Sequence, residues 1–163
     1  MDTLFIWPTL VIIGALLHLF ISKGPRTKDR VIEIFLLYIL VIMVGFGGIW
    51  AFIGHAFMPD QIAAYIGWPA GSPFQFEVAC TNLGFGILGI LCFWIRGNFW
   101  TATIIGFSVF YLGAAYGHIM DIIKHGNYAP GNAGAPLYLD IILPIVLIIL
   151  LVAYKKTSKT SGT

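Results

Sequence analysis

Residues 31–56 read VIEIFLLYILVIMVGFGGIWAFIGHA, and this stretch decides the fold class. Its only acid is Glu33, near the start, and its only histidine is His55, near the end. About 20 consecutive apolar residues cross the hydrocarbon core of a bilayer as a helix. The stretch therefore predicts a transmembrane helix that is longer than the minimum and tilts or projects beyond the membrane.

Four further apolar segments flank this one. They are residues 4–22, 76–95, 98–123 and 136–154. Of the 163 residues, 59% are hydrophobic and only 10% are charged, whereas soluble domains carry about 25% charge. We therefore expect an all-α integral membrane bundle of five spans that forms one domain over residues 1–163. The first span has the fewest polar residues, so we expect it at the periphery of a four-helix core.

The basic residues predict an orientation in the membrane. Eight of the nine fall at one side of a five-span topology: Lys23, Arg26, Lys28, Arg30, Arg96, Lys155, Lys156 and Lys159. Only Lys124 lies on the other side. Cytoplasmic loops carry the excess of Lys and Arg, so the N-terminus is predicted outside and the C-terminus in the cytoplasm. The net charge is only +2 and no contiguous basic face exists, which excludes nucleic acid as a partner.

Glycines within the spans predict close packing between helices. Small residues let helix backbones approach each other in lipid. Gly45 and Gly48 share a helix face with His55, and Gly113-Ala114-Ala115-Tyr116-Gly117 is a GxxxG sequence. Residues 84–89, GFGILG, match the spacing of a dinucleotide fingerprint but lie inside an apolar helix, so we interpret them as a packing surface too. Any glycine face left over would suit a second copy or a larger membrane-protein partner.

Ionisable residues collect at one end of the predicted bundle. They come from four spans: His55, Glu77, His118, Asp121 and Asp140. In the predicted topology this is the outer end. Ionisable groups are costly inside a membrane and mark functional sites, so these residues are the candidate ligand- or proton-binding group. Asn82 is a secondary candidate, since its helix face makes it suited to bonding between helices.

Three interpretations of this group stay open. Structurally, the His and Asp side chains satisfy one another and tie a loop to a helix end. As a metal site, His55, Glu77, His118 and Asp121 supply two imidazoles and two carboxylates, a set suited to zinc, iron or manganese. As a proton-linked site without metal, the histidines and carboxylates exchange protons with a quinone, a solute or an apolar substrate.

Two loops lie at the same end of the bundle. Loop 57–75 contains a predicted short interfacial helix that begins after Pro59, and loop 124–135 is rich in Gly, Asn and Pro. Both are expected to lie over the outer mouth of the bundle, as connections or as lids.

Three stretches carry a resemblance to a known family: Gly54-His55-Ala56-Phe57, residues 66–77 (IGWPAGSPFQFE) and Tyr116-Gly117-His118. Over residues 30–150 the chain resembles a family of small prokaryotic polytopic membrane proteins that is catalogued as a domain of unknown function. The resemblance implies a bacterial or archaeal inner-membrane location and brings no mechanism with it.

Together these observations predict a membrane protein that binds a small ligand, a proton or a metal ion at its outer end. A membrane-embedded enzyme and a redox-linked protein both fit this prediction. Two alternatives are an accessory subunit that docks through glycine-rich faces, and a proton-coupled transporter. Between His55 and the inner ends the spans are almost wholly apolar, which argues against a continuous polar pathway.

Overall fold

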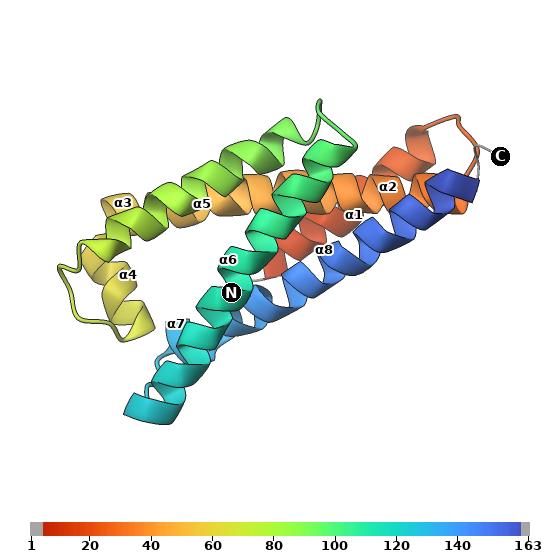
Figure 1. Cartoon of the computed structure of the whole chain (residues 1–163). Coiled ribbons are helices and arrows are strands. Elements are labelled where there is room, and N and C mark those ends of the chain that lie inside the picture. Colours follow the sequence, from red (N-terminus) through yellow and green to blue (C-terminus); the bar gives the residue numbers. More distant parts are fainter. Residues whose placement is uncertain (1–4, 161–163) are drawn as a thin grey trace.

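A computed structural model describes residues 5–160 of the chain, with side chains to residue 157, and every regular element in this range is a helix. The elements are α1 (Ile6–Ile21), α2 (Lys28–Tyr38), the π-helical segment η2 (Ile39–Phe46), α3 (Gly47–Phe57), α4 (Pro59–Ile66), α5 (Phe74–Leu91), α6 (Asn98–His125), α7 (Pro130–Ala133) and α8 (Ala135–Thr160). The long helices form an antiparallel bundle that opens toward one end (Figure 1). The all-α fold is confirmed.

Four helical segments are long and apolar enough to cross a membrane: Lys28–Phe57, Phe74–Leu91, Asn98–His125 and Pro130–Thr157. The first is the continuous run α2–η2–α3, which contains the predicted span 31–56. The predicted span 76–95 ends earlier, because the chain turns after Leu91. The predicted short helix after Pro59 is α4, with Pro59 in its first turn.

Helix α1 is apolar but has only 16 residues, about 24 Å of helix against a hydrocarbon core of about 30 Å. Its buried residues Val11, Ala15 and Leu19 recur every fourth position and form one stripe. This stripe packs along α2 and η2, where Ala15 and Leu19 contact Ile34. Most of its other large apolar side chains are exposed. Residue 4, the predicted start of this span, lies outside the described residues.

Glycines bring the long helix and α5 into backbone contact. A Cβ added to Gly89 would lie 2.4 Å from the Gly45 backbone nitrogen, and one added to Gly48 would lie 2.8 Å from the Asn82 carbonyl oxygen. Gly86 meets the backbone of Gly45 and Ile49 in the same way. The predicted packing role is confirmed for Gly45, Gly48, Gly86 and Gly89. It is wrong for Gly84, whose added Cβ would meet no heavy atom within 4 Å in the described structure. The wider π-helical turn of η2 lies at this contact, with the Leu40 carbonyl also within 2.7 Å of a Cβ at Gly89.

A second pair, α6 and α8, packs against the first half of the long helix. Large buried side chains here include Trp100, Phe107 and Leu147, which share one core with Leu36 and Leu40. At the nearby turn before α6, the Trp100 indole Nε1–H donates to the Cys92 carbonyl at 2.8 Å. This core holds the two helix pairs together at the end where α5 leads into α6.

The two pairs separate toward the opposite end (Figure 1). We call this the histidine end: α3 and α6 end there, and α5 and α8 begin there. Phe85 of α5 packs between Phe107 and Phe110 of α6, and beyond these rings the helices diverge. Short helices α4 and α7 contact each other and bridge the divergent pairs.

Two glycines of α6, Gly113 and Gly117, take no part in this packing. A Cβ added to Gly113 or Gly117 would meet no heavy atom within 4 Å in the described part of the chain. The prediction that their GxxxG spacing packs helices is therefore wrong within this chain. The physical reason is the divergence of α6 from α3 and α5, which leaves this helix face without a neighbour.

Candidate functional site

The space between the divergent helix pairs is a cavity of about 1490 Å³. Helix α3 forms one wall, α6 and α8 form the other, and α4, Trp68 and α7 cover the histidine end. Five of the six candidate residues line it: His55, Asn82, His118, Asp121 and Asp140. The bundle thus brings residues from four helices to the border of one space, and we call it the main cavity.

One buried polar group on its wall consists of His118, Asn132 and Asp140. These side chains come from α6, α7 and α8, and the residues are 8%, 0% and 7% exposed. The His118 Nδ1 lies 2.6 Å from Asn132 Oδ1. The His118 Nε2 lies 3.7 Å from Asp140 Oδ2. His118 is therefore held on one side by an amide and faces a carboxyl group on the other.

The hydrogen bonds of Asn132 settle which ring nitrogen of His118 carries a proton. Its amide Nδ2 donates to the Asn127 carbonyl at 2.8 Å and to the His118 carbonyl at 3.3 Å. With both amide protons committed, Oδ1 is the atom that faces His118 and it can only accept. The Nδ1–H of His118 therefore donates to Asn132. In a neutral ring Nε2 is then the acceptor, and it faces Asp140 and the main cavity.

A stacked tryptophan covers this group. The Trp68 ring lies over the His118 ring with 6.2 Å between centroids and 12° between planes. Trp68 follows Gly67, which caps the C-terminus of α4 with a φ of 82°, a left-handed conformation that suits glycine. A Cβ there would also lie 2.5 Å from Asn127 Oδ1. Glycine at this position lets the segment after α4 turn back across the histidine end.

Asp121 accepts hydrogen bonds from residues at the end of α6 and in the loop that follows it. Its Oδ1 lies 2.7 Å from His125 Nδ1, and its Oδ2 accepts from Asn127 Nδ2 at 2.6 Å. Asn127 Nδ2 also donates to the Ile66 carbonyl at the end of α4, at 2.9 Å. The Asp121 carboxylate thus holds Asn127 of the 126–129 loop against α6, and the Asn127 amide fastens this loop to α4. Although Asp121 borders the main cavity, both its oxygens have protein partners.

Asn82 and Tyr111, which both line the main cavity, join α5 to α6. The Tyr111 hydroxyl donates to Asn82 Oδ1 at 2.6 Å, and Asn82 Nδ2 donates to the Val78 carbonyl at 2.9 Å. The interhelical role expected of Asn82 is confirmed by this geometry. The bond lies close to the point where the two helices begin to diverge.

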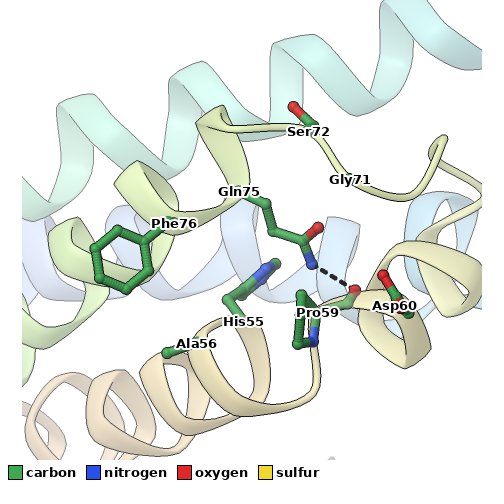
Figure 2. Close-up of a pocket in the computed structure, with 8 residues that line it drawn as sticks. All are labelled: His55, Ala56, Pro59, Asp60, Gly71, Ser72, Gln75 and Phe76. Atoms are coloured by element: carbon green, nitrogen blue, oxygen red, sulfur yellow. Dashed lines mark hydrogen bonds between the residues drawn. The ribbon is translucent and has the colours of Figure 1, made fainter.

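A smaller pocket of about 230 Å³ lies where α3, α4 and α5 meet (Figure 2). Gln75 Nε2 donates to the Pro59 carbonyl at 2.7 Å, and the ring of His55 points into the same space. Asp60 and Ser72 form the exposed rim. Among the described residues, His55 is the one that lines both this pocket and the main cavity, and its buried Nδ1 has no hydrogen-bond partner there.

Glu77 lies apart from the other candidates. It is exposed at the start of α5 and borders neither space in the described structure. Residues 5–160 contain no group of three or more His, Cys, Asp or Glu side chains that could hold a metal ion. The four candidate metal ligands, His55, Glu77, His118 and Asp121, are thus not brought together here. The structure instead assigns His118 and Asp121 to different hydrogen-bond partners.

Sequence reasoning overlooked the amides and the tyrosine that organise the site. Asn127 and Asn132 lie in the segment noted only for its Gly, Asn and Pro content, and Tyr111 lies inside an apolar span. One signal was available for Tyr111: its hydroxyl lies in the middle of α6, much as Asn82 lies in the middle of α5, and buried polar groups in lipid pair with one another. For Asn132 no comparable signal exists, because α7 has only four residues.

The chain was compared with protein families, curated proteins and solved structures. No curated protein and no solved structure matches it. A family model described as a family of unknown function, DUF6790, matches residues 1–160. The match includes the first helix, which the resemblance over residues 30–150 left out. The expected membership of an uncharacterised family is confirmed: the chain belongs to the DUF6790 family of unknown function.

Proposed function

We propose that this protein binds a small molecule in the main cavity and exchanges a proton with it through His118 and Asp140. The observation that carries the proposal is the buried Asn132–His118–Asp140 arrangement on the wall of a large, mostly apolar space. Ligand sites are typically apolar cavities with a few convergent polar groups. This cavity has that composition at its histidine end.

The 3.7 Å between His118 Nε2 and Asp140 Oδ2 favours this role. A direct hydrogen bond between these atoms would be about 3 Å long, so neither atom is fully committed to the other. A ligand hydroxyl beside both atoms would donate to neutral Nε2 or to the Asp140 carboxylate, and a ligand carbonyl would accept from whichever of the two groups carries the proton. A proton can then pass between the ligand and either group, which is general acid–base chemistry. Asn132 acts as a positioning residue that keeps Nε2 turned toward the ligand.

We further infer that the chain crosses the membrane five times with the histidine end outside. The basic residues support this, since Arg96 and the Lys23–Arg30 segment lie at the opposite end of the bundle from Lys124. A cysteine placed at Ser72, on the exposed rim of the smaller pocket, tests the sidedness in intact cells. Labelling by a membrane-impermeant thiol reagent supports the orientation, and labelling only after lysis contradicts it.

Extraction of bound molecules tests ligand binding. Wild type and the variants Asp140→Asn and Leu139→Trp are purified identically, and their bound small molecules are compared by mass spectrometry. We expect a compound enriched over bulk lipid in wild type and lost in both variants, since one removes the proton-exchanging carboxyl and the other fills the main cavity. Glu77→Gln, on the surface, should keep the compound. Equal content in wild type and in a folded Leu139→Trp variant would refute ligand binding.

An accessory-subunit role is the second candidate, because some glycine surface is left over. Gly84 on α5 has no heavy atom within 4 Å of an added Cβ in the described structure, as is true of Gly113 and Gly117. Such surface could receive a helix of a second copy or of a larger partner. A complex of fixed stoichiometry that Gly84→Leu dissociates would support this role. A transporter is less well supported, since Met43, Phe107 and Phe110 line the inner part of the main cavity.

A further inference from the structure

The main cavity is open sideways, between α3 and α6. Trp50 and Ile53 on α3 and Val109 on α6 border it, yet these residues are 58%, 41% and 71% exposed. All three lie within segments long and apolar enough to span a membrane. Their exposed surface would therefore face hydrocarbon and not water. The opening between them leads from the membrane interior into the main cavity.

Charge is confined to one end of this space. The His, Asp and Lys side chains that line it are His55, His118, Asp121, Lys124, His125 and Asp140. All belong to the histidine end, in the last turns of α3 and α6 or the first turns of α8. The lateral opening itself is bordered by apolar side chains and glycine. A molecule that fits both regions has a polar head and an apolar body.

One stretch of the α6 wall, between Tyr111 and His118, presents only small residues to the opening. Gly113, Ala114 and Gly117 all line the main cavity, and an added Cβ at either glycine would meet open space. By contrast, the packed glycines of α5 have backbone atoms of η2 and α3 against them. The small residues of α6 therefore widen the opening instead of joining two helices.

We propose that the ligand is a bilayer-dissolved amphipath that enters between α3 and α6. It would carry an acyl or isoprenoid chain, and would place a hydroxyl or carbonyl head at His118 and Asp140. This inference rests on the proposed function and names its ligand class. The position of the opening supports it, because a space continuous with hydrocarbon fills with apolar chains at no cost in exposed apolar surface.

The ends of the cavity favour a lipid chain over a partner helix. Helix α4, Trp68 and α7 cover the histidine end, and Phe107 and Met43 lie toward the other. A spanning helix needs about 20 residues, or about 30 Å, to cross the membrane. It could not continue past the covered end, whereas a single-chain amphipath can end there with its head group.

Photolabelling of the full chain in phosphatidylcholine nanodiscs tests the inference. The probes are a diazirine-bearing fatty alcohol and a small water-soluble diazirine, and adducts are mapped by mass spectrometry. In wild type the fatty alcohol should give saturable adducts on Leu139 and Met120, which line the main cavity. Adducts on exposed Ile149 of α8, which does not line it, should not saturate.

Two variants narrow the opening without touching packed residues. Gly113→Leu and Val109→Trp should abolish the saturable adducts and leave labelling of Ile149 unchanged. Gly113→Ala, which adds one methyl group, should keep them. Unchanged helix content and elution volume would show that each variant is folded.

Three outcomes would overturn the inference. Saturable adducts that persist in both narrowed variants would place the entry elsewhere. Labelling of Leu139 by the water-soluble probe alone would assign entry from the aqueous side and leave the proposed function standing. Discs that hold two chains with Leu139 protected would assign the opening to a second copy. If the extraction experiment also finds no compound, the proposed function itself fails.

Discussion

The two glycine-bearing surfaces of this bundle look alike in sequence and differ in what surrounds them. Gly45, Gly48 and Gly89 lie at the contact between the long helix and α5, where added Cβ atoms would fall 2.4–3.0 Å from other residues. Gly113 and Gly117 on α6 face the main cavity, with nothing within 4 Å in the described structure. The first surface closes one half of the molecule through backbone contact. The second keeps the other half open, and polar side chains hold that half together instead.

Because the closed contact has no free space, adding a methyl group there should lower the unfolding free energy by a large amount. In Gly89→Ala the new methyl would lie 2.4 Å from Gly45 N and 2.7 Å from Leu40 O, and neither helix can retreat without losing the whole contact. Overpacking of this kind costs about 3 kcal/mol or more where backbone must move. The unfolding free energy in mixed detergent micelles measures it.

Gly84→Ala is the matched control on the same helix, because its added Cβ meets open space. If the two variants have the same unfolding free energy, the backbone contact between η2 and α5 is not tight and the comparison fails.

The stability of the open half, and the position of the proton on His118, should depend on Asn132. Asn132→Leu removes the acceptor for His118 Nδ1–H and the donor for the carbonyls of His118 and Asn127. Leaving buried groups unsatisfied costs about 1–3 kcal/mol. Nitrogen NMR of labelled histidine supplies a second readout: wild-type His118 should be protonated on Nδ1, and the variant should lose this preference.

Asn98→Leu, at the exposed start of α6, should change neither quantity. A His118 that is protonated only on Nε2 in wild type would contradict the assigned orientation of Asn132 and with it the proposed proton exchange.

Removing the hydrogen bond between Tyr111 of α6 and Asn82 of α5 should lower the unfolding free energy by a smaller amount. Tyr111→Phe removes the 2.6 Å hydrogen bond to Asn82 and keeps the aromatic ring in its stack with Phe107. Hydrogen bonds between helices in lipid contribute about 0.6 kcal/mol on average and up to about 1.7. Tyr116→Phe, at an exposed position of the same helix, is the control. Equal unfolding free energies for the two would show that the bond does not help to join α5 to α6.

The smallest expected change in unfolding free energy is a gain in stability, opposite in sign to the losses above. Gly113→Ala adds a methyl group in open space and restricts the unfolded chain, so it should stabilise the protein by about 0.5 kcal/mol. The same substitution at Gly89 and at Gly113 thus moves the unfolding free energy in opposite directions. A destabilised Gly113→Ala would mean that α6 has a neighbour at this face, and the cavity would be smaller than described.

Much of the fold could be predicted from hydropathy, and less of the site. The apolar run 31–56 lies within one continuous helix, and the helix after Pro59 forms as its sequence indicates. His55, His118 and Asp140 reach one cavity because they lie at similar depths on antiparallel helices. Glu77 has a similar depth but faces outward. Depth follows from position along a span, whereas facing depends on how each helix is rotated against its neighbours.

The sequence by itself determined the helices, the apolar character of the segments that are long enough to cross a membrane, and the gathering of ionisable residues at one end. These are local properties, because hydrophobic length and helical periodicity depend only on neighbouring residues. The tertiary structure alone decided which glycines pack and which stay open. It also decided that Asp121 fastens a loop while Asp140 faces His118. Those outcomes depend on the separation of α6 from α3 and α5, which is set by contacts between segments far apart in the chain.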